Sequence, residues 1–339
     1  MNYGVSSRFA DRSRRNRSRL KGWISARFAT GLAAKIFQTT WDSSSHMKLL
    51  YVHAHYDDYE FTAAGTFALF QHKYGERLRA KVLVCTDGQA GHHFRTREET
   101  GRIRLKEQAA SAQLGRYEFE LLRLPNGAPP REACLQVTPE LLAALWKAIR
   151  EFEPDYLFCP PLPTDPLAGV HNDHLTIADA VRRVAYMINV PHAFTPEYSA
   201  DETRSCACRV PVILNVYDGY MSGSNAFDLA IDVEEFFPLI RDMTWCHQSQ
   251  VAEWLPWVGR HDMGIPKTVN DWAKILRERF DRHNRELGLE TEHAVEVFRV
   301  TAWGTVPALG QLLADFPSIW REGSNLSALD SRLRAWSGG

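Results

Sequence analysis

Two short stretches of this chain carry residue types that could bind a metal ion and move a proton. The first, residues 55–60, places the imidazole of His55 beside two adjacent carboxylates, Asp57 and Asp58. Two acids side by side next to an apolar strand are costly to bury without a cation or a catalytic task. The second, residues 171–174, holds two histidines three positions apart. A catalytic zinc site needs three protein ligands and an open position for water, which these stretches could supply together.

The elements around these stretches alternate between strands and helices. Residues 49–52 form an apolar run typical of a buried strand, and the small residues 63–65 lead into a helix. Further strands are predicted at residues 80–86, 119–124, 156–159, 212–216, 227–231 and 294–300. Further helices are predicted at residues 97–114, 138–153, 175–185, 234–254 and 269–287.

This alternation predicts an α/β fold: a Rossmann-like, mostly parallel sheet with helices on both faces, followed by a C-terminal α+β extension. In a 3-2-1-4 strand order, the first and fourth strands are neighbours at the switch point of the sheet. The loops that follow them, with residues 55–60 and 171–174, are therefore expected to meet in one crevice.

Three segments are expected along the chain. Residues 1–46 are basic, with nine Lys or Arg against two Asp, and are predicted to be a disordered extension. An organelle transit peptide has the same composition, and Met47 could instead be the true start. Residues 47–305 are expected to form the folded domain, and residues 306–339 a C-terminal tail.

The bulk composition excludes several classes of function. The formal net charge is −1, and because residues 1–46 carry +7, the remainder is mildly acidic, which argues against a nucleic-acid surface. The six cysteines are scattered without a CxxC pair, so a reducing, cytoplasmic setting is the simpler interpretation. No run approaches the ~20 apolar residues of a membrane span. Whether the chain forms a homo-oligomer is left open.

Beyond residues 55–60 and 171–174, several short patterns occur in an order that resembles a known family. His55-x-Asp57-Asp58-x-Glu60 followed by Gly65-Thr66, and His171-x-x-His174, are similar to the two signatures of the PIG-L/LmbE family of zinc-dependent sugar N-deacetylases. The further matches are Thr86-x-Gly88-x-x-Gly91, Arg104-x-x-Glu107, Leu124-Pro125-Asn126-Gly127, Asp232, His247-x-Ser249-Gln250 and Glu296-x-Phe298. The resemblance covers residues 47 to about 302.

The resemblance implies a division of roles among five residues. His55, Asp58 and His174 would be the zinc ligands. Asp57 would be the general base that takes a proton from water. His171 would stabilise the oxyanion or protonate the leaving amine. Ligation by two histidines and an aspartate also accommodates other divalent ions, such as Fe²⁺.

Supporting roles follow from the same resemblance. Arg104 and Asn126 would contact the substrate. Glu60 and Asp173 would support the metal ligands without binding the metal themselves. Asn126 stands where the family commonly has an aspartate. Arg102 is an alternative to Arg104 as the substrate-binding arginine. The helix between Arg104 and Gly115 is one residue shorter than the family pattern usually has.

The activity that the resemblance implies is removal of the N-acetyl group from an N-acetylglucosamine-type sugar conjugate. A neighbouring hypothesis keeps the site but takes a non-sugar or natural-product amide as substrate. A hypothesis from another class is a non-catalytic sugar-binding module, against which the complete set of five residues argues. His53 is expected to be structural, and both structural and functional roles are left open for Asp232 and Glu296.

Overall fold

The structure, a computed structural model, describes residues 46–199, 208–221, 223–259 and 263–338. The expected basic extension lies outside the described residues, except for His46. Among the described helices, none combines the length and the apolar character that crossing a membrane requires.

Seven strands form one sheet at the centre of the fold. In chain order they are β1 (Met47–His53), β2 (Leu78–Val84), β3 (Glu118–Leu121), β4 (Tyr156–Cys159), β5 (Val212–Val216), β6 (Leu229–Asp232) and β7 (Val295–Val300). Their order across the sheet is β3-β2-β1-β4-β5-β7-β6, with β7 antiparallel to both of its neighbours and all other pairs parallel. The predicted α/β fold with a mostly parallel sheet is confirmed, as is the 3-2-1-4 order.

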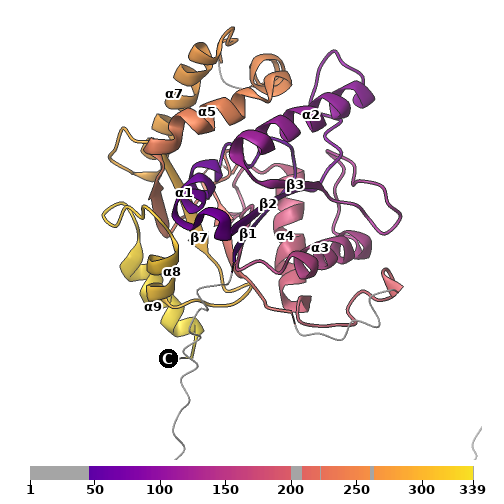
Figure 1. The fold of residues 1–339 in the computed structure, drawn as a ribbon, viewed down its shortest axis with the longest axis vertical. Coiled ribbons are helices and arrows are strands. Elements are labelled where there is room, and N and C mark those ends of the chain that lie inside the picture. The colour runs from indigo at the N-terminus through magenta and orange to yellow at the C-terminus, as the bar shows by residue number, and fades with distance from the viewer. Residues whose placement is uncertain (1–45, 200–207, 222, 260–262, 339) are drawn as a thin grey trace, which may run out of the picture. The chain divides into compact units, whose positions relative to one another are not determined.

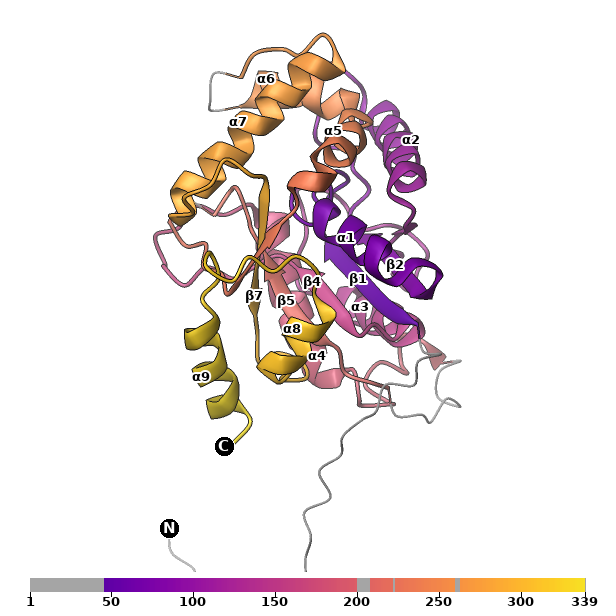
Figure 2. The same ribbon diagram turned by 60° about the vertical axis from the view of Figure 1, so that its left-hand side comes forward.

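The helices connect these strands and cover both faces of the sheet (Figures 1 and 2). The α-helices are α1 (Ala64–Tyr74), α2 (Arg97–Gly115), α3 (Pro139–Phe152), α4 (Asn172–Met187), α5 (Phe237–Trp245), α6 (Leu255–Val258), α7 (Val269–Leu287), α8 (Leu309–Asp315) and α9 (Leu326–Trp336). The shorter elements are the 3₁₀ turns η1 (Gly75–Arg77) and η3 (Glu234–Phe236) and the π-helix η4 (Ser249–Trp254).

Strand β1 shows how the sheet divides two hydrophobic cores. Successive side chains of a strand point to opposite faces. Leu49 and Tyr51 are buried in the core that also contains residues of α1, α5 and α7, whereas Leu50 and Val52 are buried with residues of α3 and α4. Because both faces are covered, the strand is apolar without alternation from Leu49 to Val52, as parallel strands generally are.

The segment 234–254 differs from the single helix that its periodicity predicts. It is divided into η3, α5 and η4, with a break around Cys246 and His247. The Ser249 backbone N–H and hydroxyl donate to the two carboxylate oxygens of Glu107 on α2, at 2.8 and 2.6 Å. This long-range contact holds the chain out of regular α-helical geometry at the start of η4.

The last residues of the chain pack on the same core as β1. Helices α8 and α9 and the residue after α8 bury Leu312, Phe316, Leu329 and Leu333 in it. Helix α8 therefore packs on the same face of the sheet as α1 (Figure 2).

Candidate active site

The first half of the site lies in the loop between β1 and α1. Within it, Asp57 adopts a φ of 79°, a left-handed conformation that is uncommon for a residue other than glycine. Its backbone N–H donates to Gln108 Oε1 on α2 at 3.2 Å. The side chain of Tyr56 is buried and packs so closely against Gly88 that a Cβ there would lie 2.3 Å from the tyrosine ring. These contacts fix the conformation of the loop between β1 and α1.

The second half lies between β4 and α4. His171 is the N-cap residue of α4: its Nδ1 accepts a hydrogen bond from the Asp173 backbone N–H at 3.2 Å. His174 follows in the first turn of the helix. Because β1 and β4 are adjacent parallel strands, the loops at their carboxyl ends meet, as predicted.

Three side chains converge where the two loops meet. His55 Nδ1 lies 3.1 Å from His174 Nε2 and 3.4 Å from Asp58 Oδ2, and His174 Nε2 lies 3.5 Å from Asp58 Oδ1. A tetrahedral zinc ion with bonds of ~2.0–2.1 Å separates its ligand atoms by roughly 3.3 Å. Two imidazole nitrogens and a carboxylate at these separations fit a divalent metal ion such as zinc.

His53, expected to be structural, contacts one of these candidate ligands. Its Nδ1 lies 2.5 Å from Asp58 Oδ2, an oxygen that also accepts the His55 backbone N–H at 2.7 Å. Two overlapping groups of potential metal-binding side chains occur in the described residues: His55 with His171 and His174, and His53 with Asp58 and His174. These two bonds fix the Asp58 carboxylate on the first loop.

In each candidate histidine ligand, the ring nitrogen that faces away from the metal position is hydrogen-bonded to a carboxylate. His55 Nε2 lies 3.1 Å from Asp173 Oδ2, and His174 Nδ1 lies 3.1 Å from Asp218 Oδ2. A hydrogen bond of this kind fixes the tautomer and the ring orientation of a metal-binding histidine and increases the basicity of its other nitrogen. Both rings therefore present their remaining nitrogen to the same point.

The electrostatics at this point favour positive charge. Burial lowers the pKa of His55 and of His174, but the surrounding carboxylates, above all Asp58, outweigh it and raise these pKa values to about 9 and about 10. Burial raises the pKa of Asp58, yet the three histidines around it hold this pKa well below its usual range. The same field that stabilises protons on the imidazoles would stabilise a bound cation.

Asp57 has the properties of a general base. Burial raises its pKa to about 6, although Arg104, whose Nη2 lies 3.4 Å from Asp57 Oδ1, opposes this effect. Ion pairs of Asp57 with residues other than Arg104 are absent from the described part of the chain. A base of this pKa next to a metal site can accept a proton from water near neutral pH.

His171 lies beside the candidate ligands as a neutral hydrogen-bond donor. Its ring centroid is 4.7 Å from that of His55 and 5.2 Å from that of Tyr220. Burial, reinforced by the neighbouring His55 and His174, lowers its pKa to about 4. Because Nδ1 accepts the Asp173 N–H, the proton of the neutral ring resides on Nε2.

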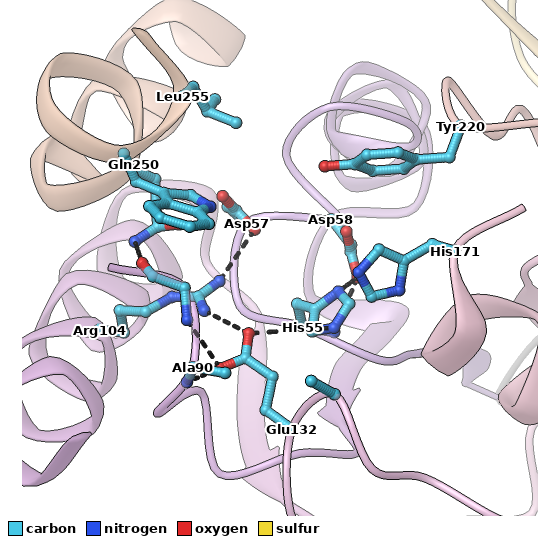
Figure 3. A pocket seen from close by; sticks show the side chains of 13 residues that line it. His55, Asp57, Asp58, Ala90, Arg104, Glu132, His171, Tyr220, Gln250 and Leu255 are labelled. Carbon is cyan, nitrogen blue, oxygen red and sulfur yellow. Dashed lines mark hydrogen bonds and ion pairs between the residues drawn. The ribbon is translucent and has the colours of Figure 1, made fainter. Parts of the chain in front are cut away.

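These side chains surround a cavity of about 230 Å³ (Figure 3). It is lined by residues from the loops after β1, β2, β3, β4 and β5 and from α2, η4 and α6: His55, Asp57, Asp58, Ala90, Gly91, Arg104, Glu132, Ala133, His171, Tyr220, Gln250, Trp254 and Leu255. Of the predicted substrate contacts, Arg104 lines the cavity, whereas Asn126 is exposed and accepts a hydrogen bond from the Ala128 N–H at 2.9 Å.

Arg104 is buried and held in position by several acceptors. Its Nη1 donates to Glu132 Oε1 at 2.8 Å, and its Nη2 donates to the Tyr56 carbonyl oxygen at 3.0 Å. Arg102, the alternative considered from the sequence, is exposed on the same helix and is not among the residues that line the cavity.

Glu60 supports the first loop from within the core. Its Oε1 accepts hydrogen bonds from Gln108 Nε2 at 2.8 Å, Ser111 Oγ at 2.5 Å and Tyr117 OH at 2.7 Å. His247 Nε2 lies 3.4 Å from the same oxygen. Since Gln108 also binds the Asp57 N–H, Glu60 is connected to the candidate base through one side chain.

Sequence reasoning missed two residues of the site. Asp218 follows β5 by two positions, and β5 adjoins β4, so the rule that strand ends carry functional groups could have identified it. Glu132 lies in an irregular segment between β3 and α3, and no motif or periodicity marks it.

Comparisons with known proteins agree with the sequence motifs. Residues 50–185, which contain both histidine-bearing stretches, match the family model PIG-L, described as GlcNAc-PI de-N-acetylase. The chain is 28% identical over 180 residues to the 1D-myo-inositol 2-acetamido-2-deoxy-alpha-D-glucopyranoside deacetylase of Rhodococcus erythropolis. This match covers 45% of the chain and 59% of that relative's length. The resemblance to the PIG-L/LmbE family is thus confirmed over this region.

Solved structures show the same fold in proteins with different activities. The N,N'-diacetylchitobiose deacetylase from Pyrococcus horikoshii superposes with a TM-score of 0.54 at 18% identity, over 76% of this chain and 84% of that one. The 4-carboxy-2-hydroxymuconate hydratase from Pseudomonas putida superposes with a TM-score of 0.53 at 14% identity, over 75% of this chain and 96% of that one. At these identities the likeness concerns the fold alone.

Proposed function

We propose that this chain, whose residues 50–185 match the PIG-L family, is a metal-dependent hydrolase that removes the N-acetyl group from an N-acetylglucosamine-type sugar conjugate. The observation that carries the proposal is the convergence of His55, Asp58 and His174 beside a carboxylate, Asp57, that forms no part of this donor set. The deacetylase from Rhodococcus erythropolis supports the substrate class.

A divalent ion held by His55, Asp58 and His174, with zinc as the first candidate, would polarise the acetyl carbonyl and lower the pKa of a bound water. Asp57 accepts the proton of the water that adds to the carbonyl carbon. His171 donates from Nε2 to the oxygen on which negative charge develops. When the C–N bond breaks, the proton moves from Asp57 to the leaving nitrogen. The products are acetate and a free amine.

The remaining cavity residues would hold the sugar. Tyr220 and Trp254 line the cavity, and aromatic faces commonly pack against sugar rings. Arg104 lies beside Asp57 with its charge shared between Glu132 and Asp57. In this arrangement Arg104 keeps the base in position and offers hydrogen-bond donors at the floor of the cavity.

The alternative keeps the site but takes a non-sugar or natural-product amide as substrate. The family match and the curated relative, whose name is that of a sugar-conjugate deacetylase, favour the N-acetyl sugar instead. The two substrate classes are separated by assaying N-acetyl sugars beside unrelated amides.

The test is acetate release from a panel of N-acetyl sugar conjugates and unrelated amides, with and without a chelator. We expect the protein to hydrolyse at least one N-acetyl sugar, and we expect the chelator to abolish this activity.

The variant Asp57→Asn tests the role of the base. It should lower kcat by about 10²–10⁴-fold while the protein retains its metal. The matched control is Asp165→Asn in an exposed loop, which should behave as the parent protein. Full activity of Asp57→Asn, or metal-free protein that turns over normally, would refute the proposal.

A further inference from the structure

Arg279, on α7, lies beside the catalytic loops. Its guanidinium group is stacked over the ring of Phe61, with 4.7 Å between the guanidinium carbon and the ring centroid. Phe61 follows Asp58 by three residues in the loop after β1. The guanidinium group also lies close to the loop after β5. A Cβ atom added to Gly219 in that loop would lie 3.6 Å from Arg279 Nη2. The next residue, Tyr220, lines the cavity.

The Arg279 side chain has no carboxylate partner among the residues that the structure describes. Its Nε is buried without a hydrogen-bond acceptor. Arg104 and Arg332 also have a buried, unbonded Nε, but their terminal nitrogens pair with Glu132 and Asp228. For the Arg279 guanidinium, neither a hydrogen bond nor an ion pair is found within the described part of the chain.

The surroundings make this unpaired charge costly. Burial lowers the pKa of Arg279, and the positive charge of Arg282, one turn further along α7, acts in the same direction. Tyr217, Tyr220 and the carboxylate of Asp57 oppose this shift, but the net change remains downward. The stacking on Phe61 uses the face of the guanidinium and leaves the N–H donors in its plane free. The hydroxyl group of Tyr217 donates to Glu286 at 2.7 Å. A partly buried cation of this kind is best satisfied by an anion.

We propose that Arg279 binds an anionic group, a phosphate or a carboxylate, that the substrate carries outside the catalytic cavity. This inference rests on the proposed deacetylase function. A guanidinium group presents paired N–H donors that match the oxygens of either anion. Tyr220 connects the two sites, because it lines the cavity and follows Gly219, the glycine that the guanidinium approaches. The substrate is therefore an N-acetyl sugar conjugate with a negatively charged substituent.

The experiment compares matched substrates on the parent protein and on Arg279→Gln. The substrates are N-acetylglucosamine 1-phosphate, N-acetylmuramic acid, which carries a carboxylate, and the neutral methyl glycoside of N-acetylglucosamine. We expect the parent protein to prefer an anionic substrate, and Arg279→Gln to lose about ten- to hundredfold of that preference in kcat/KM. The two anionic substrates distinguish phosphate from carboxylate. Arg279→Lys should recover part of the preference.

The control is Arg285→Gln, which removes the same charge from an exposed position on the same helix and should leave the preference intact. An unchanged ratio of anionic to neutral kcat/KM in Arg279→Gln would overturn the anion site while leaving the deacetylase function in place. If no amide is hydrolysed, the deacetylase proposal fails. The site is then tested by the shift in unfolding temperature that inorganic phosphate or acetate produces. Equal shifts in the parent protein and Arg279→Gln would refute it.

Discussion

Asp173 and Asp218 perform the same physical task for two histidines that lie 119 residues apart in the chain. Each carboxylate accepts from the ring nitrogen that points away from the candidate metal position, and so determines which nitrogen remains free to bind. Because an imidazole has two chemically similar nitrogens, this second contact decides whether the ring can act as a ligand at all.

Removing one of these carboxylates should weaken metal binding without removing a ligand. We predict that Asp218→Asn lowers the affinity for zinc by about 10- to 100-fold, since the His174 ring loses its charged partner. Competition with a chromophoric chelator measures the affinity. Asp232→Asn, which alters a carboxylate paired with His293 away from the cavity, is the control. Equal zinc affinities in the parent protein and in Asp218→Asn would show that the contact does not act on the metal.

The site could be predicted from sequence where motif and topology coincide. His55, Asp58 and His174 follow the carboxyl ends of adjacent strands, so their convergence follows from the strand order. Glu132 lies between β3 and α3 in a segment without regular structure, and its approach to Arg104 depends on how that segment packs. No local pattern encodes such a path, because it is set by contacts between residues distant in sequence.

At the level of elements, helix α1 is capped by a strand from the other end of the chain. Its N-cap residue, Ala63, has no side-chain acceptor. Instead, Glu296 on β7 accepts the backbone N–H groups of Gly65 and Thr66, both at 2.8 Å. Of the two roles left open for Glu296, the structure supports the structural one. The buried carboxylate also lies at the positive end of the helix dipole.

Loss of this cap should destabilise the fold. We predict that Glu296→Ala lowers the free energy of unfolding by about 2–3 kcal/mol, because two buried N–H donors lose their acceptor. Urea unfolding measures the change. Glu290→Ala, at an exposed position just before β7, serves as the control and should have little effect. A loss below ~0.5 kcal/mol in Glu296→Ala would mean that water replaces the cap.

The pair formed by His247 and Glu60 joins the segment before η4 to the loop after β1. Burial lowers the pKa of His247, but Glu60 outweighs it, so the net shift is upward. Burial raises the pKa of Glu60, yet His247 and the hydrogen bonds from Ser111 and Tyr117 bring it below its usual value. The histidine's contribution to stability is complete below its unfolded pKa of ~6.5 and is lost as the pH rises through the higher folded value.

His247→Gln should therefore destabilise the protein in a pH-dependent way. We expect a penalty of about 3 kcal/mol at pH 6, because the Glu60 carboxylate is left buried without its cation, and a smaller penalty at pH 9. Urea unfolding at both pH values measures it. His293→Gln breaks an exposed pair of the same kind, 2.7 Å from Asp232, and should change little at either pH. A penalty independent of pH would contradict the ion pair.

The segment 234–254 shows where sequence periodicity is insufficient. Its apolar spacing predicts one continuous helix, and α5 fulfils that prediction in part. The break follows from Glu107, which binds the start of η4, and from His247, which points into the core toward Glu60. By contrast, α3 begins where predicted, with Thr138 accepting from the Leu141 N–H and Pro139 in the first turn. Local signals specify that helix start, whereas tertiary contacts specify the break.

For the whole molecule, the candidate metal ligands connect two separate loops of the sheet. A bound ion would join the loop after β1 to the start of α4 and stabilise the folded state over the unfolded one. We predict that zinc at about 100 times its Kd stabilises the protein by about 2.7 kcal/mol. Thermal unfolding with added zinc, and again with chelator, measures this effect. Asp58→Asn should lose the stabilisation while Asp165→Asn keeps it, and equal shifts in both variants would exclude this site as the origin.

Strand β7 is the last strand of the chain, yet it lies inside the sheet between β5 and β6. During translation, both loops that carry the candidate site residues leave the ribosome well before this strand does. A nascent chain that ends before residue 295 contains the five candidate site residues but lacks β7. It therefore lacks one of the two strands that pair with β5, and it lacks Glu296, which caps α1. Because domains fold as units once their sequence is complete, incomplete chains are expected to be inactive. Activity in a translation reaction should therefore appear only with chains that include β7.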